Sequence, residues 1–122
     1  MTIQEYKTFE DMNLSDEVLR GIYSIGYENP SAIQRLVIHP LINIKNRDII
    51  AQSQSGTGKT AAFGIGVISR MQNSNGLSVI LSPTRELAIQ TYDCIKELSI
   101  YSELKTTLCV GGFGFKKCYK YQ

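Results

Sequence analysis

Hydrophobic residues in the first third of the chain recur at intervals of three to four, which places them on one face of an amphipathic helix. The first such helix follows Ser15, whose hydroxyl suits an N-cap position, and it carries Val18 and Ile22 on its apolar face. Gly26 is a natural stop, because glycine readily adopts the left-handed conformation that ends many helices. The pattern therefore predicts a short helix that buries one face.

A second helix is predicted to begin near residues 29–31, where a proline and a serine follow a polar turn. Its apolar residues Ile33, Val37 and Leu41 are expected to point inward. Pro40 has no backbone N–H to continue the helical hydrogen bonds, so it is expected to kink or end this helix.

Short apolar runs alternate with helical patterns in the rest of the chain. Strands are predicted at 49–51, 77–82 and 106–110, and helices at 59–71 and 83–98. The second run, LSVILS, alternates little, as expected of a strand that is buried on both faces. This order predicts an α/β fold, with a parallel sheet and helices on both of its faces.

Composition narrows the class of protein without identifying it. The 122 residues are 43% hydrophobic, enough for one core, and the net charge of +2 is too small to indicate nucleic-acid binding. Three cysteines without a Cys-x-x-Cys pair suggest neither a disulfide framework nor a zinc site, and favour an intracellular setting, cytoplasmic or nuclear. No apolar run approaches the roughly 20 residues of a membrane span, so no membrane partner is expected.

The segment 51–60, AQSQSGTGKT, is similar to the Walker A phosphate loop, although Ser53 stands where that pattern has its first glycine. Glycines free the backbone so that successive N–H groups can face one phosphate, and the helix that follows favours an anion at its N-terminus. A lysine and a threonine complete the pattern, as ligands of phosphate and of Mg²⁺. The predicted nucleotide-binding residues are Ser55, Gly56, Thr57, Gly58, Lys59 and Thr60, the last two also catalytic. The alternative is a Gly/Ser-rich turn that precedes Lys-Thr by chance.

Four motifs, in this order along the chain, resemble those of the DEAD-box RNA helicases. The segments FEDMNLSDEVLRGIY at 9–23 and AQSQSGTGKT at 51–60 look most similar to the translation-initiation-factor-4A group of that family. GYENPSAIQ at 26–34 is similar to the Q motif, AQSQSGTGKT at 51–60 to the first motif, PTRELA at 83–88 to motif Ia, and the glycine pair at 111–112 to the GG motif. Phe9 stands where that family has an isolated upstream aromatic residue. The resemblance implies that residues 1–122 are the N-terminal portion of the first RecA-like helicase domain, a partial P-loop NTPase fold.

The resemblance also implies roles for residues outside the phosphate loop. Tyr27 and Phe9 would pack on adenine, and the backbone near Asn29 would contact the base. The amide of Gln34 offers a donor and an acceptor, which match N7 and N6 of adenine and not the edge of guanine. The alternatives are core packing for the two aromatic rings and a solvated helix position for Gln34.

Motif Ia and the GG pair would follow the RNA backbone without reading its sequence. The residues expected to bind RNA are Pro83, Thr84, Arg85, Gly111 and Gly112. Backbone N–H groups, a hydroxyl and a guanidinium are suitable phosphate ligands. An ion pair between Arg85 and Glu86 is the alternative, and Phe113, where the family commonly has threonine, departs from the pattern.

The implied function is that of an ATP-dependent RNA helicase with ATP and Mg²⁺ as cofactors, RNA as partner, and translation-initiation or mRNA-processing proteins as further partners. The 122 residues contain neither the D-E-A-D motif nor a second domain, so the isolated chain is predicted to be inactive in turnover. A non-catalytic nucleotide- or RNA-binding module and another P-loop enzyme, such as a small-molecule kinase or a GTPase, are the alternatives.

Overall fold

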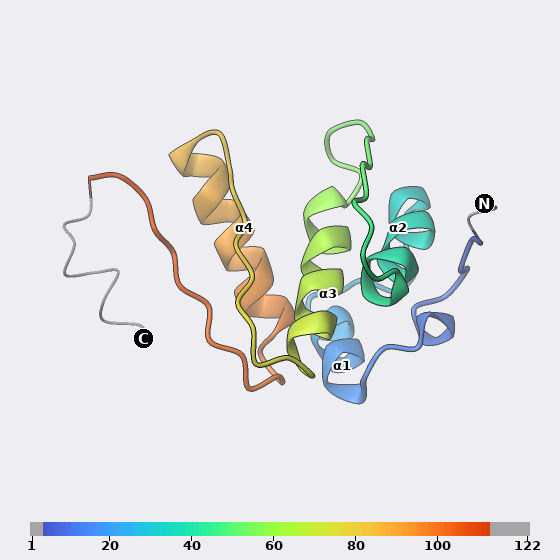
Figure 1. Ribbon diagram of the computed structural model, residues 1–122. Coiled ribbons are helices and arrows are strands. Elements are labelled where there is room, and N and C mark those ends of the chain that lie inside the picture. Colours follow the sequence, from blue (N-terminus) through green and yellow to red (C-terminus); the bar gives the residue numbers. More distant parts are fainter. Residues whose placement is uncertain (1–3, 113–122) are drawn as a thin grey trace.

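A computed structural model describes residues 4–112, whose helices form a layer centred on α3 (Figure 1). After the short 3-10 helix η1 (Glu10–Met12) come α1 (Asp16–Ser24), α2 (Ala32–Asn43), α3 (Lys59–Met71) and α4 (Arg85–Leu98). α3 packs against α2 on one side and α4 on the other, and α1 lies against the C-terminal end of α4. The core is made of buried apolar side chains: Phe9, Met12, Val18, Ile22, Ile38, Ala61, Ala62, Ile65, Ile68, Ile95 and Leu98.

Local sequence signals explain where two of these helices begin. The hydroxyl of Ser15 accepts a hydrogen bond from the Val18 N–H at 3.3 Å, which confirms the predicted cap of α1. The hydroxyl of Thr84 accepts a hydrogen bond from the N–H of the third residue of α4 at 3.2 Å, so Thr84 caps the helix predicted at 83–98, which begins at Arg85. The predicted helix at 59–71 is confirmed with its bounds as α3.

The second helix differs from its prediction in two respects. α2 continues past Pro40 to Asn43, because a proline removes one hydrogen bond and the remaining ones can carry the last turn. Its buried residues are Gln34 and Ile38, whereas the predicted Val37 is only half-buried. Ile33 and Leu41 are also half-buried, and Leu41 does face α3, since a Cβ on Gly66 would lie 2.8 Å from its Cβ.

The three predicted strands are extended segments in the structure, and none of them forms a strand within residues 4–112. A strand requires a partner for its N–H and C=O groups, and no backbone hydrogen bond of residues 49–52 or 77–82 reaches another described segment. All three segments run toward the upper end of the molecule in Figure 1. The predicted parallel direction is therefore present, while the hydrogen-bonded sheet is not.

Candidate nucleotide and RNA site

The phosphate loop at 51–60 is closed on itself by three short polar contacts. The Lys59 ammonium donates to the carbonyl oxygen of Ser53 at 2.6 Å. The Thr57 hydroxyl donates to the carbonyl oxygen of Gln54 at 2.6 Å, so the Ser53 hydroxyl, 2.6 Å from the same Thr57 oxygen, must be the donor of that second pair. The loop thus holds its lysine over its own backbone, and an incoming phosphate would exchange with the Ser53 carbonyl.

Two glycines in the left-handed region shape this loop and leave the N-terminus of α3 open. Gly56 has φ +78° and Gly58 has φ +86°, values that residues with a side chain rarely adopt. Gly58 is the N-cap of α3 and has no side chain to cap it, in contrast to Ser15 and Thr84. The first intrahelical bond there runs from the Ala62 N–H to the Gly58 carbonyl at 3.0 Å. The preceding N–H groups, including that of Thr60, have no intrahelical partner and can face an anion.

Gln34 connects the N-terminal end of α2 to the phosphate loop. Its Oε1 accepts from the Ser31 N–H at 2.9 Å, and its Nε2 donates to the Gly58 carbonyl at 3.2 Å. The side chain is only 1% exposed, so it is not the solvated position that the alternative required. An amide carries a second lone pair and a second N–H, and these are what Gln34 has left for a base.

The aromatic residues of the expected adenine site lie in the helical layer. Phe9 is 0% exposed and packs edge-to-face against Tyr23, with ring centroids 6.4 Å apart. Tyr27 is partly buried against the core; burial raises the pKa of its phenol, with smaller effects from Cys94 and Glu97 of α4. Asn29 is exposed on the segment that leads into α2. The structure brings Gln34 to the phosphate loop, but no described hydrogen bond or ring contact brings these three residues there.

The two segments expected to bind RNA meet at the N-terminal end of α4. Gly112 has φ +88°, and a Cβ on it would lie 2.8 Å from Nη2 of Arg85, so guanidinium and turn are in contact. Thr84 caps α4, and Pro83 is exposed beside it. Arg85 is exposed and forms no ion pair with Glu86 or another residue among those described. The alternative role for Arg85, an ion pair with Glu86, is therefore not seen.

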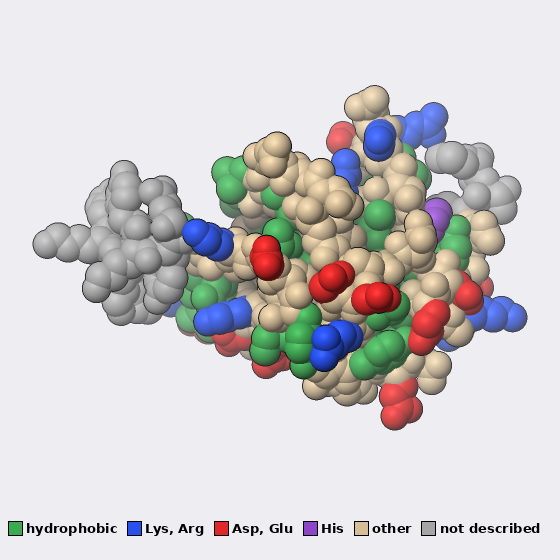
Figure 2. Space-filling view, turned by 90° about the horizontal axis from the view of Figure 1, so that it is seen from below, with side chains coloured by type: hydrophobic (Ala, Val, Ile, Leu, Met, Phe, Trp, Pro, Cys, Tyr) green, Lys and Arg blue, Asp and Glu red, His purple; other side chains and the backbone are tan. Residues whose placement is uncertain are grey.

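The phosphate loop, residues 83–85 and the turn at 111–112 all lie at the upper end of the molecule in Figure 1. Ligand sites of open α/β folds form at this edge, beyond the carboxyl ends of the extended segments. Phe113 lies outside the described residues. The opposite end, seen in Figure 2, mixes acidic, basic and apolar side chains and has no continuous basic track.

The contacts that close the loop were not predicted from the sequence. Ser53 departs from the glycine pattern, but its carbonyl binds Lys59 and its hydroxyl binds Thr57. Two hydroxyl residues four positions apart across a Gly-containing turn were the available signal. Within residues 4–112, no helix has the length and apolarity to cross a membrane, and no three metal-ligating side chains cluster.

Comparisons with known proteins identify the family to which the chain is similar. A family model described as DEAD/DEAH box helicase matches residues 31–120. The chain is 48% identical over 112 residues to the ATP-dependent RNA helicase FAL1 of Candida albicans, covering 90% of this chain and 28% of that protein. It is 47% identical over 109 residues to eukaryotic initiation factor 4A of Drosophila melanogaster, covering 88% and 27%.

Solved structures that are similar to this chain are DEAD-box proteins as well. A DEAD box protein from the hyperthermophile Methanococcus jannaschii matches with a TM-score of 0.87 and 40% identity, over 96% of this chain and 32% of that one. Dbp5 of S. cerevisiae, bound to RNA and ADP BeF3, matches with a TM-score of 0.78 and 37% identity, over 88% and 28%. The chain spans between a quarter and a third of the length of these relatives. The chain therefore belongs to the DEAD/DEAH box helicase family, and its described part corresponds to a portion of a RecA-like helicase domain.

Proposed function

We propose that this chain binds ATP together with Mg²⁺ at the phosphate loop. Lys59 contacts the β- and γ-phosphates after it leaves the Ser53 carbonyl, and the Thr60 hydroxyl is a ligand of the ion. The backbone N–H groups of residues 55–58 surround the phosphates. When bound, Mg²⁺ neutralises phosphate charge. The open N-terminus of α3 supports this assignment, because a residue that capped it would occupy the position of the anion.

The adenine site is proposed on the α2 side of the loop. The remaining N–H and lone pair of Gln34 are complementary to N7 and N6 of adenine and would clash with guanine. Tyr27, Phe9 and the backbone near Asn29 are proposed to line the site. For Phe9 this requires a change in packing, since its ring is fully covered without nucleotide.

RNA is the proposed second ligand, held through its backbone by residues 83–85 and the glycine pair at 111–112. The contact between Arg85 and Gly112 places these two segments at one position, as a backbone-binding track requires. Dbp5 of S. cerevisiae, which is similar in structure, has been solved with RNA and ADP BeF3. Its two ligands are of the classes proposed for this chain.

The whole-protein activity proposed is that of an ATP-dependent RNA helicase within the cell, with translation-initiation or mRNA-processing proteins as partners. In such a protein residues 1–122 are the N-terminal portion of the first RecA-like domain, and the extended segments are strands of a parallel sheet covered by helices on both faces. For the 122 residues alone we propose binding without turnover, because they contain no D-E-A-D motif to hold Mg²⁺ and position water.

The experiment is a titration of the purified 122-residue chain with fluorescent ATP and GTP analogues in the presence of Mg²⁺. Lys59→Ala should weaken the binding of both nucleotides, and Gln34→Ala should remove the preference for ATP over GTP. Release of phosphate should stay at the background rate. A folded chain that binds neither nucleotide, or that prefers GTP, would contradict the proposal, and circular dichroism establishes that the chain is folded.

A further inference from the structure

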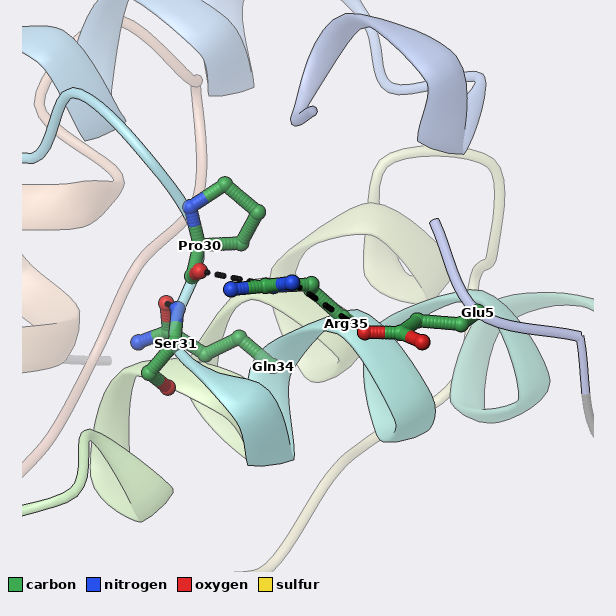
Figure 3. A network of polar contacts seen from close by, with 5 residues as sticks. All are labelled: Glu5, Pro30, Ser31, Gln34 and Arg35. Carbon is green, nitrogen blue, oxygen red and sulfur yellow. Dashed lines mark hydrogen bonds and ion pairs between the residues drawn. The ribbon is translucent and has the colours of Figure 1, made fainter. Parts of the chain in front are cut away.

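The peptide unit between Pro30 and Ser31 is held from both sides by consecutive residues of the first turn of α2 (Figure 3). On one side, Nε of Arg35 donates to the Pro30 carbonyl oxygen at 3.2 Å. On the other, the Ser31 N–H donates to Oε1 of Gln34 at 2.9 Å. The orientation of this single peptide plane therefore depends on Arg35 and is transmitted to Gln34.

The peptide plane determines which end of the Gln34 amide faces the phosphate loop. Because the Ser31 N–H can be paired only by an acceptor, it directs Oε1 toward itself and leaves Nε2 for the Gly58 carbonyl, 3.2 Å away. The opposite orientation would place two oxygens against each other at Gly58 and two donors against each other at Ser31. There is little room for other arrangements, since a Cβ on Gly58 would lie 2.4 Å from Nε2.

Arg35 is itself anchored by the N-terminal segment. Its Nη1 forms an ion pair with the Glu5 carboxylate at 3.1 Å, and its carbonyl oxygen accepts from the Tyr6 N–H at 3.2 Å. The Tyr6 ring stacks on His39 of α2, with centroids 4.2 Å apart, which holds the segment along this helix. The Arg35 side chain is 38% exposed, so its contacts do not serve to fill the core.

We propose that Arg35 is a positioning residue of the nucleotide site. It fixes the Pro30–Ser31 peptide so that Gln34 presents its N–H₂ to the phosphate loop and keeps the donor–acceptor order that distinguishes adenine from guanine. The inference rests on the proposed nucleotide function, in which Gln34 reads the base. It adds a residue beyond those of the motif, together with the N-terminal segment that anchors it.

The test compares Arg35→Gln with Arg20→Gln, which removes an equal charge from α1, where Arg20 lies over the Tyr101 ring at 4.6 Å. Two quantities are measured: the ratio of ATP to GTP affinity, and hydrogen–deuterium exchange of the backbone amides of Ser31 and Ala62, of which the second donates to the Gly58 carbonyl that Gln34 also binds. Arg35→Gln should reduce the ATP preference by about fivefold, the effect of about one hydrogen bond, and speed exchange at both places. Glu5→Gln should have a smaller effect, since exposed ion pairs contribute little, and Arg20→Gln none.

The outcomes separate this inference from the proposed function. If Arg35→Gln lowers ATP and GTP affinity equally, or leaves their ratio and the exchange rates unchanged, Arg35 has no positioning role. If the wild-type chain binds no nucleotide, the proposed function fails, and the exchange rates decide about Arg35 independently. Faster exchange at Ser31 and Ala62 in Arg35→Gln alone would then still establish the positioning contact. The urea midpoint of each variant shows whether a change reflects general destabilisation.

Discussion

At the scale of single residues, hydrogen bonds within the phosphate loop hold it closed. Lys59 is bound to the Ser53 carbonyl, and Thr57 links the two sides of the turn. The Gln34 amide supports the loop from α2 through the Gly58 carbonyl. In the proposed nucleotide complex, phosphate would replace hydrogen bonds within the loop, while the contact from Gln34 would persist.

The two glycines of the loop form a natural pair for testing the Gln34 contact. Both have positive φ, so an alanine at either position is expected to cost about 1 kcal/mol of backbone strain. A Cβ on Gly56 would meet nothing within 4 Å, whereas one on Gly58 would lie 2.4 Å from Nε2 of Gln34. Gly58→Ala should therefore lower the urea midpoint and the ATP affinity more than Gly56→Ala. Equal effects of the two substitutions would mean that Gln34 does not support the loop.

At the scale of elements, what the sequence predicts depends on whether the cause is local. The starts of α1 and α4 follow from Ser15 and Thr84, because a cap acts within four residues of the chain. The residues predicted to point inward from α2 are only half-buried, whereas Gln34 and Ile38 are fully covered, because packing against the rest of the molecule decides the degree of burial. The strands were predicted from apolar runs, but pairing depends on segments far apart in sequence, which no local pattern supplies.

The same distinction applies to the candidate site. The Walker-type pattern predicted the loop and its left-handed glycines, since their spacing directly reflects the backbone that phosphate requires. The hydrogen bonds of the Gln34 and Arg35 side chains could not be predicted, because they arise only when the turn before α2 meets the loop before α3.

The N-terminal end of α4 gives a second test, because it joins two segments expected to bind RNA. Arg85→Gln removes the guanidinium that contacts Gly112, and it should weaken the binding of RNA equally, whatever the RNA sequence. The slope of log K against log salt concentration should fall by about 0.7, the value for one lost contact to a single strand. Lys96→Gln is the matched control, since Lys96 lies in the last turn of the same helix, near the Tyr92 ring. A variant at Arg85 with an unchanged salt slope would show that this end of α4 does not contact RNA.

At the scale of the whole molecule, one face of the extended segments is packed and the other is open. In 103–110, exposed and half-buried residues alternate, so one side of the segment lies against the helical layer. A cavity of about 600 Å³ lies between this segment, residues 77–82 and the helices α3 and α4. Leu77, Val79 and Leu81 are 89%, 72% and 88% exposed. Apolar side chains in a strand pattern without a covering layer are what a sheet covered on one face only would present.

Adjacent residues of the segment 77–82 allow the two faces to be compared directly. Val79 is 72% exposed and Ile80 is 37% exposed. In the 122-residue chain, Val79→Asp should change the free energy of unfolding by less than about 0.5 kcal/mol, as for most surface substitutions. Ile80→Asp should be clearly more destabilising, because it brings a charge toward the helical layer. Urea denaturation at several protein concentrations measures both. If Val79→Asp is as destabilising as Ile80→Asp, the outer face is already covered in solution, and a dependence on concentration would identify a second copy of the chain as the cover.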